Sequence, residues 1–157
     1  MALCDAVVDA VNTAYAVAAP GDWPCSFNAR RAFAQVADLD DIKAADDPLV
    51  LIIPHTDREE GPLDWSGEYE VMCVIYARAG IPGSDAAEAA CAKFMALRDI
   101  LRDSLRRVQL SVTGIRTFQA ILSAVNVTDT LPAYGMDSLL QKHCFCGSQV
   151  LVFMVNA

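Results

Sequence analysis

Two apolar blocks near the middle of the chain have the patterns of neighbouring β-strands. Residues 49–54 are short, rich in β-branched side chains and apolar on both faces, which is typical of a central strand. The block at residues 68–76, with the two residues that follow, has the alternation of a strand with one face in the core. Its apolar face is expected to consist of Tyr69, Val71, Cys73, Ile75 and Ala77, and the charged residues Glu68, Glu70 and Arg78 lie on the opposite face. Because the blocks follow one another, we expect an antiparallel hairpin. The polar span between them, residues 55–66, is predicted to be a loop, and loops of this length are commonly functional.

Helical periodicity marks two further segments. Residues 3–18 carry an apolar stripe opposite aspartates, which predicts an amphipathic helix. Residues 85–108 are predicted to form the longest helix, with Asp85 as its N-cap. The buried stripe of that helix is expected to consist of Ala90, Phe94, Leu97, Leu101, Leu105 and Val108. Its outer face is expected to carry the charged residues Arg98, Asp99, Arg102, Asp103, Arg106 and Arg107.

The remaining segments are extended or ambiguous. Residues 25–36 alternate but include charges, which favours an edge strand. Residues 149–155 are apolar on both faces and are predicted to form an interior strand. Residues 110–127 fit both a helix and a strand, and their β-branched side chains favour the strand. Residues 134–141 are expected to form a short helical turn.

Together these segments predict the fold class. The chain has 157 residues, enough for one domain with its own core, and we expect that domain to span residues 1–157. Helices that pack on a mostly antiparallel sheet define the α+β class. We therefore expect four to five strands, flanked by an N-terminal helix and one long helix.

The composition narrows the possible partners. A formal net charge of -8 argues against a nucleic-acid-binding face, because phosphate binding requires clustered Lys and Arg. No apolar run approaches the roughly 20 residues that span a bilayer, and the first residues lack the basic region of a signal peptide. We therefore expect a protein made inside the cell, with its six cysteines reduced.

The search for a catalytic or metal site finds little. His143, Cys144 and Cys146 form the most suggestive cluster, but a zinc site needs four ligands, usually as two spaced pairs. Packing of these cysteines in the core is the favoured interpretation. No spacing supports a nucleophilic site built from Cys144, His55 and Asp57. We predict no catalytic residue, no cofactor and no metal.

Two segments are candidate protein interfaces. The loop at 55–66 offers charged side chains for polar contacts and Trp65 as an apolar anchor, although packing of Trp65 on its own sheet is an equal alternative. The loop residues singled out are Asp57, Arg58, Glu59, Glu60, Asp64 and Trp65. The second candidate is the predicted edge strand with its paired Arg30 and Arg31.

The order of the segments resembles that of the tail-terminator (tail-completion) proteins of long-tailed bacteriophages. The residues that carry the resemblance are Arg30 and Arg31 in the strand after the first helix, the acidic residues 38–41, the apolar residues 49–54, residues 68–71 before the long helix, and residues 132–140 before the last strand. The resemblance covers nearly the whole chain, and it is one of order and patterning.

The resemblance implies a non-enzymatic, structural role in the virion. Such proteins assemble in the host cytoplasm into a ring, generally of six subunits, on top of the finished tail tube. The ring ends tube polymerisation and joins the tail to the head, and DNA passes through its channel without specific binding. The implied partners are further copies of the chain, the tail tube protein and a head-completion or neck protein. No membrane is implied.

Three other functions stay open from the sequence. The chain fits another neck component, such as a head-closure or adaptor protein. It also fits a small cytosolic enzyme or thiol–metal protein that uses His143, Cys144 and Cys146. The third alternative is a ligand-binding α+β domain that forms no ring.

Overall fold

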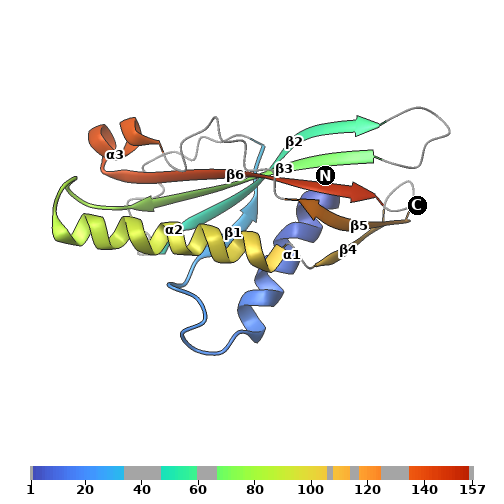
Figure 1. Ribbon diagram of the computed structural model, residues 1–157, viewed down its shortest axis with the longest axis horizontal. Coiled ribbons are helices and arrows are strands. Elements are labelled where there is room, and N and C mark those ends of the chain that lie inside the picture. Colours follow the sequence, from blue (N-terminus) through green and yellow to red (C-terminus); the bar gives the residue numbers. More distant parts are fainter. Residues whose placement is uncertain are drawn as a thin grey trace.

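The computed structural model describes residues 2–33, 47–59, 67–105, 108–113, 117–124 and 135–155 (Figure 1). In chain order the elements are α1 (Ala2–Val17), β1 (Asn28–Arg31), β2 (Leu49–Glu59), β3 (Gly67–Arg78), α2 (Asp85–Leu105), β4 (Gln109–Thr113), β5 (Thr117–Ala124), α3 (Met136–Lys142) and β6 (Cys144–Val155). The N-terminal helix, the long helix and the short helical turn all lie where the sequence predicts them.

Within these residues the strands form one sheet in the order β1-β2-β3-β6-β5-β4. β1 pairs with β2 in parallel, and every other neighbouring pair is antiparallel. The α+β class is thereby confirmed, with a mostly antiparallel sheet and the two expected helices. The described sheet has six strands rather than four to five, because the ambiguous segment 110–127 belongs to two strands, β4 and β5.

β2 and β3 form the antiparallel hairpin that the two apolar blocks predict, and it is longer than expected. The prediction that a loop begins at residue 55 was wrong. The register shifts between Pro54 and Thr56, and pairing then continues until Glu59 lies opposite Gly67. Such a shift is typical of a β-bulge, which accommodates the missing N–H of Pro54 in the ladder. The polar residues after the bulge therefore extend the strand.

β6 is an interior strand, as the sequence predicts. It lies between β3 and β5 and is antiparallel to both. It begins at Cys144, opposite Arg78, which is earlier than the expected start at residue 149. Its position explains much of its apolar character, because both of its edges are paired and one face, with Phe145, Leu151 and Phe153, is fully buried, whereas Val150 and Val152 on the other face are half-buried.

The principal core lies between the sheet and the two longer helices, which cover the same face (Figure 1). Val7 and Val11 of α1 and Leu97 and Leu101 of α2 are at most 1% exposed. The buried strand residues in the same cluster are Ala29, Val50, Ile52, Val71, Cys73, Ile75, Ala77, Leu110, Phe145, Leu151 and Phe153. Burial of each large side chain stabilises the fold by roughly 1.5–3 kcal/mol. This core therefore fixes α1 and α2 relative to the sheet.

The opposite face of β2 and β3 is buried as well. Its buried residues are Leu51, Ile53, Met72, Val74 and Tyr76. This second cluster explains why residues 49–54 are apolar on both faces. It also shows that the charged residues expected on that face of β3, including Glu70 and Arg78, are confined to the ends of the strand.

The N-cap of α2 is Ser84 rather than the predicted Asp85. The hydroxyl oxygen of Ser84 accepts a hydrogen bond from the N–H of Ala87 at 3.2 Å and donates one to the carbonyl of Ile81 at 2.7 Å. Asp85 is instead the first helical residue, where its negative charge complements the helix dipole.

Candidate protein-binding surface

β1 is an edge strand with an open outer side. The N–H of Asn28 donates to the carbonyl of Pro48, just before β2, at 3.1 Å, and the N–H of Ala32 donates to the carbonyl of Ile52 in β2 at 3.0 Å. Alternate residues of a strand bond to opposite sides, so the backbone groups of Ala29 and Arg31 point away from β2. No strand in the described part of the chain pairs with that side. The prediction of an edge strand is thus confirmed, although β1 spans only Asn28–Arg31 of the predicted residues 25–36.

Arg31 is fixed between the first helix and an exposed aromatic ring. Its Nη1 donates to the two carboxylate oxygens of Asp5 in α1, at 2.9 and 2.7 Å. Its guanidinium carbon lies 5.7 Å from the centroid of the Phe33 ring, within cation–π range. The Phe33 side chain is 70% exposed. An aromatic ring held beside an arginine is typical of the residues that anchor protein interfaces.

Arg30 supplies the uncompensated positive charge of this strand. Its side chain is exposed, and it forms no ion pair or hydrogen bond with any side chain that the structure describes. Residues 28–33 contain two arginines and no acidic residue. Since Asp5 compensates Arg31, residues 28–33 keep the single positive charge of Arg30, while Asp47 accepts a hydrogen bond from Ser26 just before the strand.

An aromatic cluster that was not predicted from the sequence holds the segment before β1 against α1. Tyr15 of α1 lies 5.8 Å from Trp23 and 4.9 Å from Phe27, measured between ring centroids in edge-on geometry. Trp23 and Phe27 are 5.2 Å apart. The three rings join the end of α1 to the segment that precedes β1. Together with the Asp5–Arg31 pair they hold β1 against α1 at two points.

The second predicted surface lies at the far end of the hairpin. Asp57, Arg58 and Glu59 belong to β2, whereas Glu60, Asp64 and Trp65 lie outside the described residues. We call residues 55–59 of β2 and 67–70 of β3 the arm. β1 pairs with β2 no further than Ile52, so no described strand lies on the outer side of β2 in the arm. Figure 1 shows the arm extending well past β1.

One copy of the chain does not bring the two predicted surfaces together. Arg30 lies opposite Leu51, and Asp57 follows Leu51 along the same strand. At 3.3 Å per strand residue, the backbones of Arg30 and Asp57 are about 20 Å apart. The arm and the β1 surface are therefore separate sites on the molecule.

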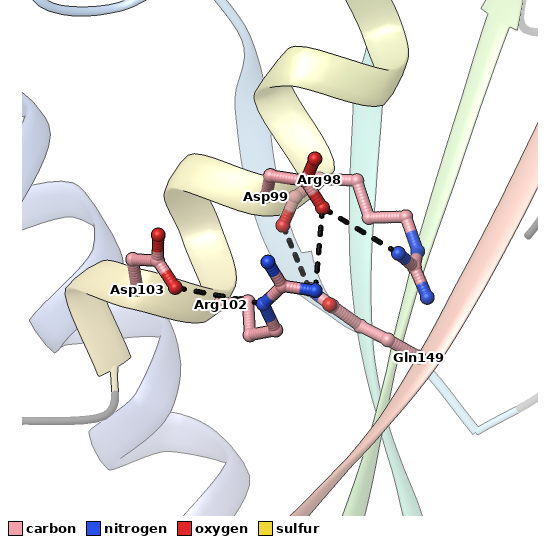
Figure 2. Close-up of polar contacts among 5 residues, drawn as sticks. All are labelled: Arg98, Asp99, Arg102, Asp103 and Gln149. Carbon is pink, nitrogen blue, oxygen red and sulfur yellow. Dashed lines mark hydrogen bonds and ion pairs between the residues drawn. The ribbon is translucent and has the colours of Figure 1, made fainter. Parts of the chain in front are cut away.

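A polar cluster with two buried members, Arg98 and Gln149, lies between α2 and the sheet (Figure 2). Arg98 was predicted on the outer face of α2, and that prediction was wrong, because the residue is only 5% exposed. It follows Phe94 by one helical turn and so shares the buried stripe. Its Nη1 lies 3.6 Å from Asp99 Oδ1, which in turn lies 3.4 Å from Nη1 of Arg102.

Gln149 of β6 completes this cluster. Its Nε2 donates to the main-chain carbonyl of Arg98 at 3.3 Å. Three buried atoms have no hydrogen-bond partner in the described structure, namely Gln149 Oε1, Arg98 Nε and Arg102 Nε. Arg102 Nε forms only a 3.5 Å ion pair with Asp103. A buried polar atom without a partner costs about 1–3 kcal/mol. The cluster therefore opposes the packing of α2.

Burial keeps the thiols of four cysteines protonated by raising their pKa. It raises the pKa of Cys73 to about 12, although Gln149 and Arg98 act on that pKa in the opposite direction. Burial also raises the pKa of Cys25, Cys91 and Cys146. Because the thiolate is the reactive form of cysteine, these four residues are poor nucleophiles at neutral pH.

His143, Cys144 and Cys146 are close in sequence and serve separate structural purposes. His143 ends α3 with a φ of 56°. The Cys144 thiol donates to the carbonyl of Lys142 at 3.3 Å, and Cys146 lies opposite Tyr76 in the sheet. Among the residues whose placement is described, no group of three or more His, Cys, Asp or Glu side chains could hold a metal ion.

Comparisons with known proteins identify no family. No protein-family model matches the chain, and no curated protein matches it either. Within the described ranges, no helix combines the length and apolar character needed to cross a membrane.

Proposed function

We propose that the chain is a structural virion protein that forms a ring at the top of a phage tail tube. In this role it ends polymerisation of the tube and provides the surface that joins the tail to the head, with a central channel for DNA. It carries out no catalysis. The order of its segments supports the proposal, because it is that of the tail-terminator proteins that the sequence resembles.

The observation that carries the proposal is a pair of open strand segments, the outer side of β1 and the outer side of the arm, which follow one another along one edge of the described sheet. A ring requires two different surfaces on each copy, so that each copy can contact a neighbour on either side. The outer side of β1 is one such surface, and the outer side of the arm is another. They lie about 20 Å apart along β2, a separation that follows from the strand rise.

Electron microscopy of tail tubes tests the proposal directly. Tube protein of the same virus is polymerised with and without the purified chain. The expected result is that tubes made with the chain have a narrower length distribution and carry a closed ring at one end. Equal length distributions, or single copies of the chain bound along the tube wall, would refute the proposal. A ring found on the head portal instead would favour a head-closure protein.

A further inference from the structure

We propose that the acidic arm of one copy binds the basic β1 edge of the next copy, so that the two surfaces are the halves of one repeated contact. This inference rests on the proposed ring and specifies how its subunits join. The occupant of the β1 edge is then a second copy of this chain.

The backbone of both surfaces is ready to extend a sheet. On β1 the N–H and C=O groups of Ala29 and Arg31 point outward, and neither residue has a backbone partner on that side among the residues that the structure describes. On β2 the outer edge is open from the end of the β1 pairing at Ile52 onward, within the described strands. Open edges of this kind are where a further strand adds by main-chain hydrogen bonding.

The charges of the two surfaces are complementary. The acidic residues of the arm are Asp57, Glu59, Glu68 and Glu70, and its basic residue is Arg58. The β1 surface offers Arg30, which has no ion-pair partner in the described part of the chain, and Arg31, which is paired with Asp5. Opposite charges at an interface select the partner and the register. By the same argument, two β1 edges or two arms repel one another, so the contact joins unlike surfaces.

The geometry excludes the same contact within one subunit. Arg30 is fixed opposite Leu51, about 20 Å along β2 from the acidic end of the arm. The position of β1 is held by α1 through the Asp5–Arg31 pair and the aromatic cluster. The arm must therefore meet the β1 edge of a different copy. Contacts between unlike surfaces, repeated around an axis, close into a ring when the rotation between neighbours closes.

Charge reversal and charge exchange test this contact. We expect Arg30→Glu to weaken self-association about 10-fold, and Glu59→Arg to do the same. When both substitutions are combined in one chain, positions 30 and 59 of neighbouring copies again carry opposite charges. The double variant should therefore recover most of the lost affinity. Arg78→Glu is the matched control, because Arg78 is an exposed strand arginine at the other end of β3. Sedimentation equilibrium measures all four proteins, with circular dichroism to confirm their folding.

Cysteine cross-linking locates the contact in assembled rings. Copies with Arg30→Cys are mixed with copies with Glu59→Cys, oxidised on capped tubes, and mapped by mass spectrometry. A 30–59 disulfide between copies supports the inference. Rings that cap tubes without this disulfide, together with no recovery in the double variant, would overturn the inference and leave the proposed function standing. If neither rings nor capping occurs, the proposed function fails, and the inference fails with it.

Discussion

One guanidinium nitrogen of Arg31 donates hydrogen bonds to both carboxylate oxygens of Asp5, and so joins the edge strand to the first turn of α1. The two side chains are 33% and 54% exposed, so water screens their attraction. The pair therefore adds little to the free energy of unfolding, and its main effect is to fix the position of β1 relative to α1. It holds β1 in place while leaving its outer edge open.

Removal of this ion pair should have a small, salt-dependent effect. We expect Asp5→Asn to lower the free energy of unfolding by about 0.2–1 kcal/mol, and the loss to shrink in 1 M salt. Urea unfolding measures it. A double-mutant cycle with Arg31→Gln separates the pair from the interaction of Asp5 with the helix dipole. A coupling energy of zero at low salt would mean that the pair does not form in solution. Asp9→Asn on the same helix is the control.

Replacement of the buried Arg98 by an apolar side chain of similar length should not destabilise the protein. Arg98→Met removes a desolvated charge and the unpartnered Nε atom, and we expect the free energy of unfolding to stay the same or rise by about 1 kcal/mol. Chemical denaturation measures the change, and Arg78→Met is the exposed control. A loss above 2 kcal/mol, on the order of that for breaking a buried ion pair, would show that the Arg98–Asp99 contact stabilises α2.

Stability should fall at alkaline pH because of the buried thiol of Cys73. Its pKa is about 12 in the folded chain and 9.0 in an exposed cysteine. The stability that this protonated thiol provides is fully present below about pH 9 and is lost as the pH rises toward 12, because only the unfolded chain then releases the proton. Between these two pKa values, each such thiol lowers the free energy of unfolding by about 1.4 kcal/mol per pH unit. We expect Cys73→Val to reduce the slope measured by urea unfolding between pH 8 and 10.5. An unchanged slope would contradict the burial of this thiol.

Replacement of His143, the residue that ends α3, by glycine should stabilise the protein. His143 has a φ of 56°, in the left-handed region that a side chain disfavours, and its N–H caps the helix through the carbonyl of Leu139. We expect His143→Gly to raise the free energy of unfolding by about 0.5–1 kcal/mol and His143→Val to lower it. Thermal unfolding of the two variants checks this. A His143→Gly variant less stable than the parent would indicate that the imidazole makes a stabilising contact.

The apolar patterns predicted most helices and strands correctly, because these elements form where apolar side chains are buried. The hairpin, the interior strand β6 and both longer helices were found from residues such as Ile52, Leu97 and Leu151, which are fully buried. The start of the arm was missed because residues 55–59 extend the strand through backbone pairing with β3, which leaves no apolar alternation in the sequence. The parallel pairing of β1 was equally invisible, since pairing direction depends on how the chain returns to the sheet.

The buried cluster could have been predicted in part. Arg98 lies on the stripe that includes Phe94 and Leu101, and helical spacing alone places it with them. Its charge suggested solvent instead, and nothing local indicated that Gln149, from a strand far along the chain, would meet its carbonyl. The proposed contact surfaces were identified as charged segments. Their separation along β2 became evident only from the register of β1.

The central place of β6 has a consequence for synthesis of the chain. β3 and β5 do not pair with each other in the described sheet, and β6 alone connects them. A nascent polypeptide therefore holds two separate half-sheets, each with an exposed hydrophobic edge, until residues 144–155 have left the ribosome. Such intermediates are the species that chaperones bind and that aggregate when translation stops early. A frameshift or stop codon just before Cys144 should therefore yield insoluble protein rather than a shortened domain.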